Sequence, residues 1–209
     1  AVFGYAHVPW FKARQRLIDE ATLPETERRF ELAEVINETL RAAGYVAIGY
    51  DHYALPDDPI ACAARESRLH RNFQGFVESE GDALIGLGPS SISTLPQGYA
   101  QNEPNVSDWQ VKVARGLIAT HRGRALSPED RERRDLIMRL LCDFELRLDA
   151  PEKFRNELAD LAPLIRDGIV EVDNGKISVP AAARPFARIV AHVFDSYRLD
   201  GAARHSRAV

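Results

Sequence analysis

A strand, a long amphipathic helix and a second strand follow one another at the start of the chain. The apolar run from Val2 to Ala6 is typical of a strand, and Tyr45 to Tyr50 is typical of another. A helix is expected between them, because Pro24 suits its first position, apolar residues recur at helical spacing and Gly44 suits its left-handed cap. This order predicts a βαβ unit, and therefore an α/β fold with a parallel sheet.

The stretch from Leu69 to Ser93 has the composition of a ligand-binding rim. Its first half gathers an arginine, two amide side chains and two aromatic rings around Gly75. A short apolar strand then begins at Leu84 and runs into Gly86 and Gly88. Glycines at the end of a strand let backbone amides approach a ligand closely, and polar ligands often lie at such strand ends.

The character of the chain changes near Ala125, where we place a domain boundary. Residues 1–125 carry the predicted sheet, whereas residues 126–209 read as short helices. A hairpin is expected from Ile169 to Val179 with an Asn-Gly turn, followed by a last helix with apolar residues from Phe186 to Tyr197. Helices, a hairpin and a further helix resemble a winged-helix arrangement.

Charge and cysteine content restrict the function classes. The 209 residues have a formal net charge of -4, which argues against a general nucleic-acid or anionic-membrane binder. From Leu126 to Asp200 there are 12 Lys and Arg against 15 Asp and Glu, so we expect the winged-helix-like part to pack rather than bind DNA. No apolar run approaches the roughly 20 residues that span a bilayer. Two cysteines, Cys62 and Cys142, are too few for a disulfide framework and are expected to be packed cytosolic thiols.

Several polar groups have both a binding and a structural interpretation. His7, His52 and His70 follow predicted strands or lie in loops, where they could share one rim or simply be surface residues. The acidic segment from Asp51 to Asp58 matches no standard metal spacing and suits a turn and helix start. A basic turn from His121 to Arg124 could hold carboxylates or be solvated. No standard catalytic motif is present.

Six stretches are more specific than composition. In order they are Tyr5-Ala6-His7-Val8-Pro9, Gly49 to Asp58, Leu69-His-Arg-Asn-Phe-Gln-Gly-Phe76, Gly86 to Ser93, Tyr99-Ala-Gln-Asn102 and Arg133 to Cys142. Together they closely resemble the C-terminal half of the oxygen-independent coproporphyrinogen III oxidase family, which consists of radical S-adenosylmethionine enzymes of haem biosynthesis. The resemblance covers nearly the whole chain.

The resemblance implies a fold and a reaction. The fold would be the C-terminal part of an incomplete parallel (β/α) barrel, followed by a small helical domain. The reaction would be the oxidative decarboxylation of two propionates of coproporphyrinogen III to vinyl groups, which gives protoporphyrinogen IX in the cytoplasm. The family uses S-adenosylmethionine, a [4Fe-4S] cluster and an electron donor protein.

The cluster of this family is held by a Cys-x3-Cys-x2-Cys motif, which is absent from this sequence. Cys62 and Cys142 do not replace it. We therefore read Ala1 as a truncation point and expect this polypeptide to be inactive alone. A partial barrel would expose apolar faces and sheet edges, so self-association is also expected.

The resemblance assigns four residues to S-adenosylmethionine binding, namely Ala6, Phe73, Gln74 and Ile92, and it assigns no catalytic residue and no metal ligand in this chain. Ile92 could equally be core packing. His70 and Arg71 would help to hold propionates or the loop. The sequence departs from the family pattern in Val77-Glu-Ser-Glu80 and at Pro89.

Two other functions stay open at this point. One is a stand-alone haem- or tetrapyrrole-binding module. The other is a winged-helix regulatory protein, for which the acidic balance of the second half predicts no protection of DNA.

Overall fold

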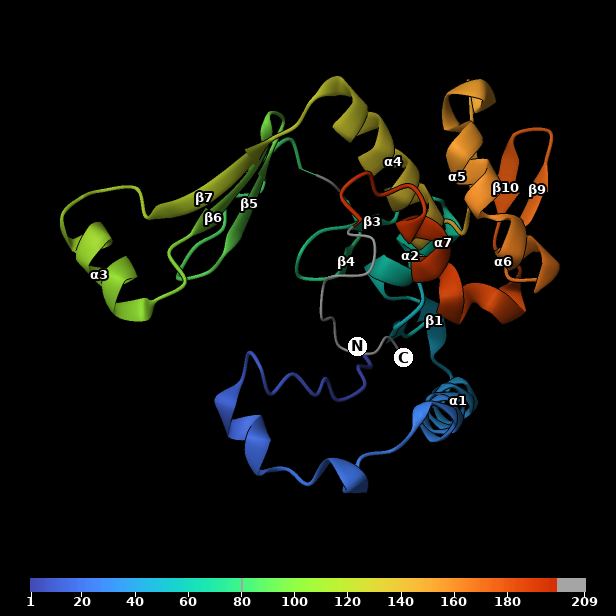
Figure 1. Cartoon of the computed structure of the whole chain (residues 1–209), viewed down its shortest axis with the longest axis horizontal. Coiled ribbons are helices and arrows are strands. Elements are labelled where there is room, and N and C mark those ends of the chain that lie inside the picture. Colours follow the sequence, from blue (N-terminus) through green and yellow to red (C-terminus); the bar gives the residue numbers. More distant parts are fainter. Residues whose placement is uncertain (80, 199–209) are drawn as a thin grey trace.

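The computed structural model describes residues 1–79 and 81–198. Figure 1 shows three parts: an N-terminal segment that leads into helix α1, a central body that holds helices α2 and α4 to α7, and an arm formed by strands β5 to β7 with helix α3. Glu80 and the predicted loose tail beyond Asp200 lie outside the described residues. The mixture of helices and strands agrees with the α/β class.

The N-terminal segment consists mostly of turns and helices. It contains the 3-10 helices η1 (Ala13–Leu17) and η2 (Glu20–Thr22), followed by α1 (Thr26–Ala42). The predicted cap at Gly44 is confirmed, because its φ is +88°. The strand predicted from Val2 to Ala6 is wrong: the described backbone gives it one bond, from the amide of Val2 to the carbonyl of Asp51 at 2.8 Å, whereas a strand needs a ladder of such bonds.

The parallel βαβ unit is also wrong. Strand β1 (Val46–Ile48) pairs antiparallel with β2 (His52–Ala54) across the short turn at residues 49–51. The predicted unit would pair β1 with a strand at residues 2–6, and no strand is present there. Its partner is β2 instead, and a three-residue turn permits only an antiparallel pair. The strand pairs of the described chain are all antiparallel, and the parallel barrel predicted for residues 1–125 is not observed in them.

A second hairpin follows helix α2 (Pro59–Arg65), which Asp58 caps by accepting the amide of Ile60 at 2.9 Å. Strands β3 (His70–Arg71) and β4 (Phe76–Val77) form this hairpin. It packs on a small core that joins it to β1, α2 and α4, consisting of Ile48, Ala61, Ala63, Leu69, Phe76 and Cys142. The hairpin is thus anchored on its buried side while its turn at residues 72–75 projects outward.

The arm is an antiparallel sheet with strand order β5-β6-β7. Its elements are β5 (Ile92–Leu95), β6 (Gly98–Asn102), α3 (Val106–Ala114) and β7 (Thr120–Ala125). The segment from His121 to Arg124 is therefore a strand rather than the predicted turn. The apolar strand predicted from Leu84 is reduced to a single bridge with Thr94, since the glycines that follow bend the chain away.

The C-terminal part combines a short sheet with several helices. Its elements are α4 (Pro128–Cys142), β8 (Glu145–Arg147), η3 (Pro151–Phe154), α5 (Arg155–Asp160), α6 (Ala162–Arg166), β9 (Glu171–Asp173), β10 (Lys176–Ser178), η4 (Ala181–Phe186) and α7 (Ala187–His192). The predicted hairpin is confirmed: β9 and β10 pair across Asn174 and Gly175, whose φ angles of 47° and 77° suit a tight hairpin turn. The expected last helix is shorter than predicted: α7 ends at His192, so Val193, Phe194 and Tyr197 lie beyond it.

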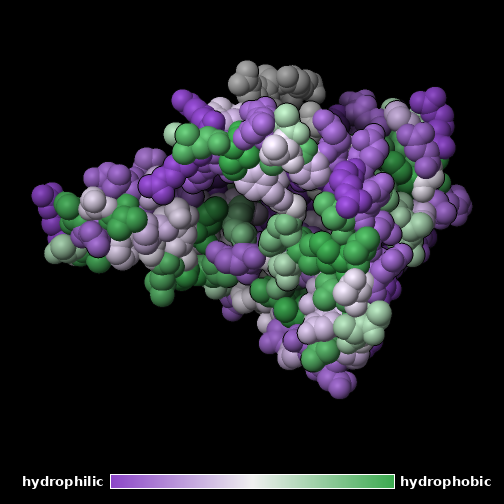
Figure 2. Space-filling view, turned by 90° about the horizontal axis from the view of Figure 1, so that it is seen from below, coloured by the Kyte–Doolittle hydropathy of each residue, from purple (hydrophilic) through white to green (hydrophobic). Residues whose placement is uncertain are grey.

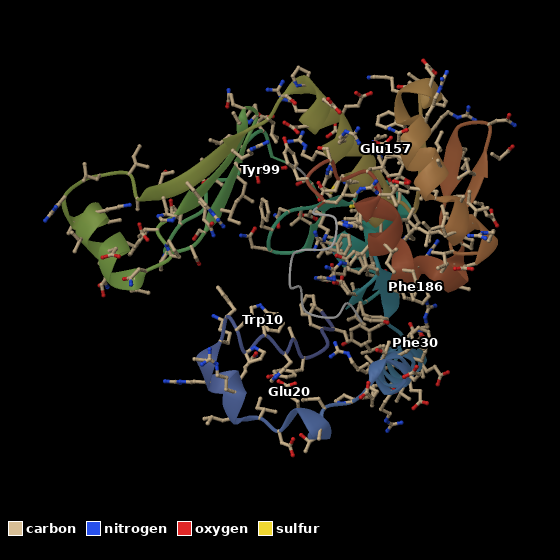
Figure 3. All side chains as sticks on the ribbon, viewed as in Figure 1. Trp10, Glu20, Phe30, Tyr99, Glu157 and Phe186 are labelled. Carbon is tan, nitrogen blue, oxygen red and sulfur yellow. The ribbon has the colours of Figure 1, made fainter. Side chains whose placement is uncertain are left out.

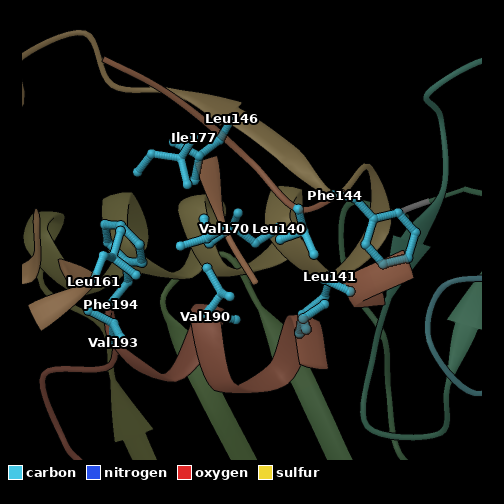
Figure 4. Packing of buried hydrophobic residues seen from close by; sticks show 14 of the residues in the cluster. Leu140, Leu141, Phe144, Leu146, Leu161, Val170, Ile177, Val190, Val193 and Phe194 are labelled. Carbon is cyan, nitrogen blue, oxygen red and sulfur yellow. The ribbon is translucent and has the colours of Figure 1, made fainter. Parts of the chain in front are cut away.

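The main core lies between α4, α7 and the β8-β10-β9 sheet (Figure 4). Its fully buried side chains include Leu140, Leu161, Ile177, Val190 and Phe194. Ser127 and Asp130 form a capping box at the start of α4. The winged-helix description and the boundary near Ala125 remain predictions, although β7 ends at Ala125.

Large apolar side chains stay exposed on α1. Val35 is 58% exposed and Leu32 41%, so the apolar stripe that predicted this helix is not covered by the described chain. Helix α1 contacts the rest of the protein through Phe30, whose ring stacks on Phe186 with centroids 6.1 Å apart (Figure 3), and through Asn37, which accepts the Tyr53 hydroxyl at 3.1 Å. Figure 2, seen from the side of α1, shows broad hydrophobic areas on this face. Among the described helices, none is long and apolar enough to cross a membrane.

Candidate functional site

A cavity of about 470 Å³ lies where the β3–β4 hairpin, the arm and α4 meet. Its lining residues are His70, Arg71, Asn72, Phe73, Val77, Ser79, Gly81, Leu84, Thr94, Tyr99, Arg124, Leu126, Asp130, Arg133, Arg134, Ile137, Met138, Leu141, Asp195, Ser196 and Tyr197. Figure 3 labels Tyr99 at the end of the arm nearest the hairpin. The volume is within the range of about 300–1,000 Å³ typical of small-molecule sites.

One face of the arm sheet forms a wall of this cavity. Tyr99 lies directly opposite Thr94 on β5 and Arg124 on β7, so all three side chains are on the same face. Ile92 is two residues from Thr94 and therefore shares this face. The Phe73 ring from the hairpin turn packs edge-on against Tyr99, with centroids 5.2 Å apart. The sheet register thus brings Ile92 and Phe73 to one surface.

Arg71 is held between aromatic rings at the buried end of the hairpin. Its guanidinium carbon lies 5.7 Å from the centre of the Tyr50 ring and 5.8 Å from that of Phe76. Its Nε atom is buried and has no hydrogen-bond partner among the described residues. Burial raises the pKa of Tyr50, and the positive charge of Arg71 opposes this shift. A cation is therefore placed in a partly apolar cavity.

Arg124, Tyr197 and Asp130 connect the arm, the end of the C-terminal part and α4. The Arg124 guanidinium lies 4.4 Å from the centre of the Tyr197 ring and donates to its hydroxyl. That hydroxyl donates to Asp130 Oδ1 at 2.7 Å. The Ser127 amide and the Tyr197 hydroxyl lower the pKa of Asp130 by bonding to its carboxylate. This network links three walls of the cavity.

The two arginines of α4 that line the cavity, Arg133 and Arg134, are paired with neighbouring groups. Arg133 bonds Glu129 at 2.9 Å and Glu157 at 2.7 Å, and the second contact joins α4 to α5 (Figure 3 labels Glu157). Arg134 pairs with Asp135 at 3.2 Å. The charge of both arginines is largely compensated within the protein, whereas no described carboxylate pairs with Arg71.

The glycine turn after Leu84 has a packing role. The Gly86 amide donates to the Ser93 hydroxyl at 3.0 Å, and the Asn102 side chain donates to the carbonyls of Gly86 and Gly88 at 3.0 Å. A Cβ on Gly86 would lie 2.8 Å from Ser91. The prediction that this amide faces a ligand is therefore wrong for Gly86, because its donor is used inside the turn.

The four predicted cofactor residues are placed unequally. Phe73 and Gln74 are exposed in the hairpin turn, and Ile92 begins β5 on the cavity side of the sheet. Ala6 lies in the N-terminal segment, where its carbonyl accepts the Gln15 amide at 3.0 Å. The described contacts do not join Ala6 to the other three. An aromatic ring, an aliphatic side chain and an amide on one surface suit an adenosyl group and a methionine chain.

The histidines divide between two regions. His52 lies against the β3–β4 hairpin, because its ring centre is 5.1 Å from that of Phe76. Its side chain also bonds Asp51 at 2.6 Å. His70 lines the cavity, whereas His7 pairs with Glu20 at 3.1 Å inside the N-terminal segment. Two of the three predicted rim histidines therefore flank the same hairpin.

The chain's thiols do not suit an iron–sulfur cluster. Cys142 is buried in the core, which raises its pKa to about 12 and favours the protonated thiol over the thiolate that binds iron. Cys62 is within hydrogen-bond distance of the Arg65 guanidinium, 3.2 Å away. No cluster of three or more His, Cys, Asp or Glu side chains suited to a metal occurs in residues 1–79 and 81–198. We therefore assign no cluster chemistry to these residues.

The chain is similar to known proteins along its whole length. An oxygen-independent coproporphyrinogen III oxidase from Bradyrhizobium diazoefficiens is 42% identical over 217 residues, covering 100% of this chain and 48% of the relative. The enzyme of the same name from Escherichia coli is 39% identical and is covered over 45% of its length. No protein-family model matches.

A solved structure extends this similarity to three dimensions. Coproporphyrinogen III oxidase from Escherichia coli, a radical SAM enzyme, superposes with a TM-score of 0.86 at 38% identity, over 93% of this chain and 47% of that one. The resemblance to oxygen-independent coproporphyrinogen III oxidase is confirmed. The chain spans about half the length of the oxidases that it matches.

Several residues that line the cavity were not predicted from the sequence. Tyr197 and Asp130 come from the end of the chain and from a helix start, and nothing in their local pattern indicates a shared site. Arg133 and Arg134 lie in one of the six stretches that resemble the family. That resemblance was the available signal that they belong to a functional site.

Proposed function

We propose that this chain is part of a radical S-adenosylmethionine oxidase that converts coproporphyrinogen III to protoporphyrinogen IX by oxidative decarboxylation of two propionates. The observation that carries the proposal is the whole-chain match to the Escherichia coli enzyme, with a TM-score of 0.86 at 38% identity. We propose that the chain is the C-terminal half, as the order of its motifs suggests, and that it divides into domains near Ala125.

In this proposal, Phe73, Gln74 and Ile92 contribute to S-adenosylmethionine binding, with Ala6 approaching from the N-terminal segment. Ile92 shares a sheet face with Tyr99, against which the Phe73 ring packs, and this supports the assignment. When bound, S-adenosylmethionine would supply the radical that abstracts hydrogen from a propionate side chain. The [4Fe-4S] cluster and the contact with an electron donor protein would belong to another segment. The free thiols Cys62 and Cys142 are compatible with the cytoplasm.

We expect the chain alone to be inactive, and a chimera to be active. The N-terminal half of the Escherichia coli enzyme would be joined to this chain at the aligned position. Anaerobic conversion of coproporphyrinogen III, followed by chromatography, is expected for the chimera and for neither half alone. The cluster absorbance and cleavage of S-adenosylmethionine would show that the chimera is assembled. An assembled chimera that leaves coproporphyrinogen III unchanged would contradict the proposal.

The second candidate is a stand-alone tetrapyrrole-binding module, which the basic cavity around Arg71 favours. Tight binding of tetrapyrroles by the chain, together with an inactive assembled chimera, would favour this module over the oxidase.

We also propose that the chain self-associates through α1, because Leu32 and Val35 are exposed on it. Light scattering is expected to give a mass above that of a monomer, and the double substitution Leu32→Lys, Val35→Lys is expected to reduce it. Glu38→Lys is the matched control, since it changes the net charge by the same amount and removes no apolar side chain. Equal masses for both variants would contradict a role for this apolar face.

A further inference from the structure

The cavity combines an apolar wall with charged side chains. Its apolar side chains are Phe73, Val77, Leu84, Leu126, Ile137, Met138 and Leu141. Its charged lining residues are Arg71, Arg124, Arg133 and Arg134 against Asp130 and Asp195. An organic anion with an apolar body would suit this lining if one of the cations is available to it.

Three of the four arginines are already paired with carboxylates or hydroxyls of the protein. Arg133 bonds Glu129 and Glu157, Arg134 bonds Asp135, and Arg124 bonds the Tyr197 hydroxyl. Arg71 differs from them, since no carboxylate pairs with it among the described residues and its Nε is buried without a partner. A buried donor without an acceptor is unfavourable. Because the Arg71 side chain lines the cavity, a carboxylate entering it would give this guanidinium an anionic partner.

The backbone and the aromatic rings fix the position of Arg71. It is paired with Phe76 across the β3–β4 hairpin, and its guanidinium lies near the rings of Tyr50 and Phe76. A guanidinium presents a planar fork of donors that binds a carboxylate in a bidentate manner. Because the group is already ordered, little side-chain freedom remains to be lost when an anion binds.

We propose that Arg71 anchors a carboxylate-binding site in this cavity, and that its ligand is a propionate side chain of a tetrapyrrole whose apolar ring edge packs between the hairpin and α4. The inference rests on the proposed function for the choice of a tetrapyrrole. To that function the inference adds the residue that recognises the substrate's carboxylate. It also places the substrate on the side of the sheet where Ile92 lies and where Phe73 packs. Arg71 is a binding residue here, and no bond is made or broken at it.

The test is a binding titration of the full 209-residue chain with coproporphyrin III, the air-stable oxidised tetracarboxylate, followed by fluorescence. The wild-type chain is expected to bind the acid about tenfold or more tightly than the tetramethyl ester, which keeps the macrocycle but cannot form the ion pair. Arg71→Gln is expected to lose about tenfold in affinity for the acid and to bind the ester as the wild type does. Arg71→Lys is expected to be intermediate, because it keeps the charge and loses the fork.

Arg131→Gln is the matched control. Arg131 is exposed on α4 and does not line the cavity, and its substitution removes the same charge as Arg71→Gln. It is expected to leave both affinities unchanged. A thermal unfolding curve for each variant shows whether it is folded, and Arg71→Lys provides the test if Arg71→Gln is not. The proposal is overturned by absent binding of the acid, by equal binding of acid and ester, or by an equal loss in Arg131→Gln.

S-adenosylmethionine also carries a carboxylate and is titrated in parallel. A loss in Arg71→Gln that affects S-adenosylmethionine and spares coproporphyrin III would overturn the tetrapyrrole assignment. The outcome is separable from that of the chimera. An active chimera whose tetrapyrrole binding does not depend on Arg71 would contradict the proposed carboxylate site and support the proposed oxidase function. Tetrapyrrole binding that depends on Arg71, together with an inactive assembled chimera, would support the carboxylate site and contradict the oxidase function.

Discussion

Replacement of Phe194 by alanine is expected to lower the free energy of unfolding by about 3–5 kcal/mol. The Phe194 side chain is fully buried, and its ring packs edge-on against Phe154 with centroids 6.0 Å apart. Its carbonyl also accepts the Arg133 guanidinium at 3.2 Å. The truncated side chain would leave a cavity between α4 and α7 that rigid helices cannot collapse. The loss is a large part of a typical stability of about 5–15 kcal/mol.

Urea unfolding followed by circular dichroism measures this change. Phe3→Ala is the control, because the Phe3 side chain is 71% exposed and its truncation leaves no comparable cavity. We expect a change below about 1 kcal/mol for the control. A similar small change for Phe194→Ala would mean that the core in Figure 4 is not the stabilising core of the chain.

Replacement of Gly49 by alanine is expected to destabilise the chain by about 2–5 kcal/mol, from two sources. Gly49 has a φ of +60°, so any L side chain there has an unfavourable backbone conformation. A Cβ would also lie 2.1 Å from Cζ of the Phe76 ring, which is buried and has little room to move. The β1–β2 turn and the β3–β4 hairpin would have to separate.

Gly44→Ala isolates the first source, the cost of the backbone conformation, so the second follows by difference. Gly44 has a φ of +88°, and a Cβ there would meet no atom within 4 Å. This variant is expected to carry only the backbone cost of about 1–2 kcal/mol. Thermal unfolding of both variants gives the difference, and equal losses would show that the Gly49–Phe76 contact is not tight. Because Phe76 flanks Arg71, Gly49→Ala is also expected to weaken coproporphyrin III binding, whereas Gly44→Ala is not.

Local structure followed closely from local sequence. The helix start at Asp58 and the hairpin turn at Asn174-Gly175 were predicted and are observed. Each depends on contacts between residues at most a few positions apart, which a sequence pattern specifies directly. The hairpin formed by β1 and β2 was missed, although Gly49 between two runs of strand-forming residues was an available signal.

The candidate site was only partly accessible to sequence reasoning. The resemblance pointed to Phe73 and Ile92, and the sheet register places both on one side of the arm. Tyr197 was not predicted, because it reaches Arg124 and Asp130 across 73 and 67 positions of the chain. Contacts of this kind arise from packing between elements and leave no periodic pattern in the sequence.

The sequence by itself determined the helix caps, the tight turns, the acidic balance and the resemblance to a radical S-adenosylmethionine oxidase, since these depend on residue type and near neighbours. Only the tertiary structure decided that the strands pair antiparallel and that, among the described residues, no carboxylate pairs with Arg71 while Arg133 and Arg134 are paired. Strand direction and ion pairing depend on which distant segments meet. That is set by the burial of side chains from the whole chain, and no single stretch specifies it.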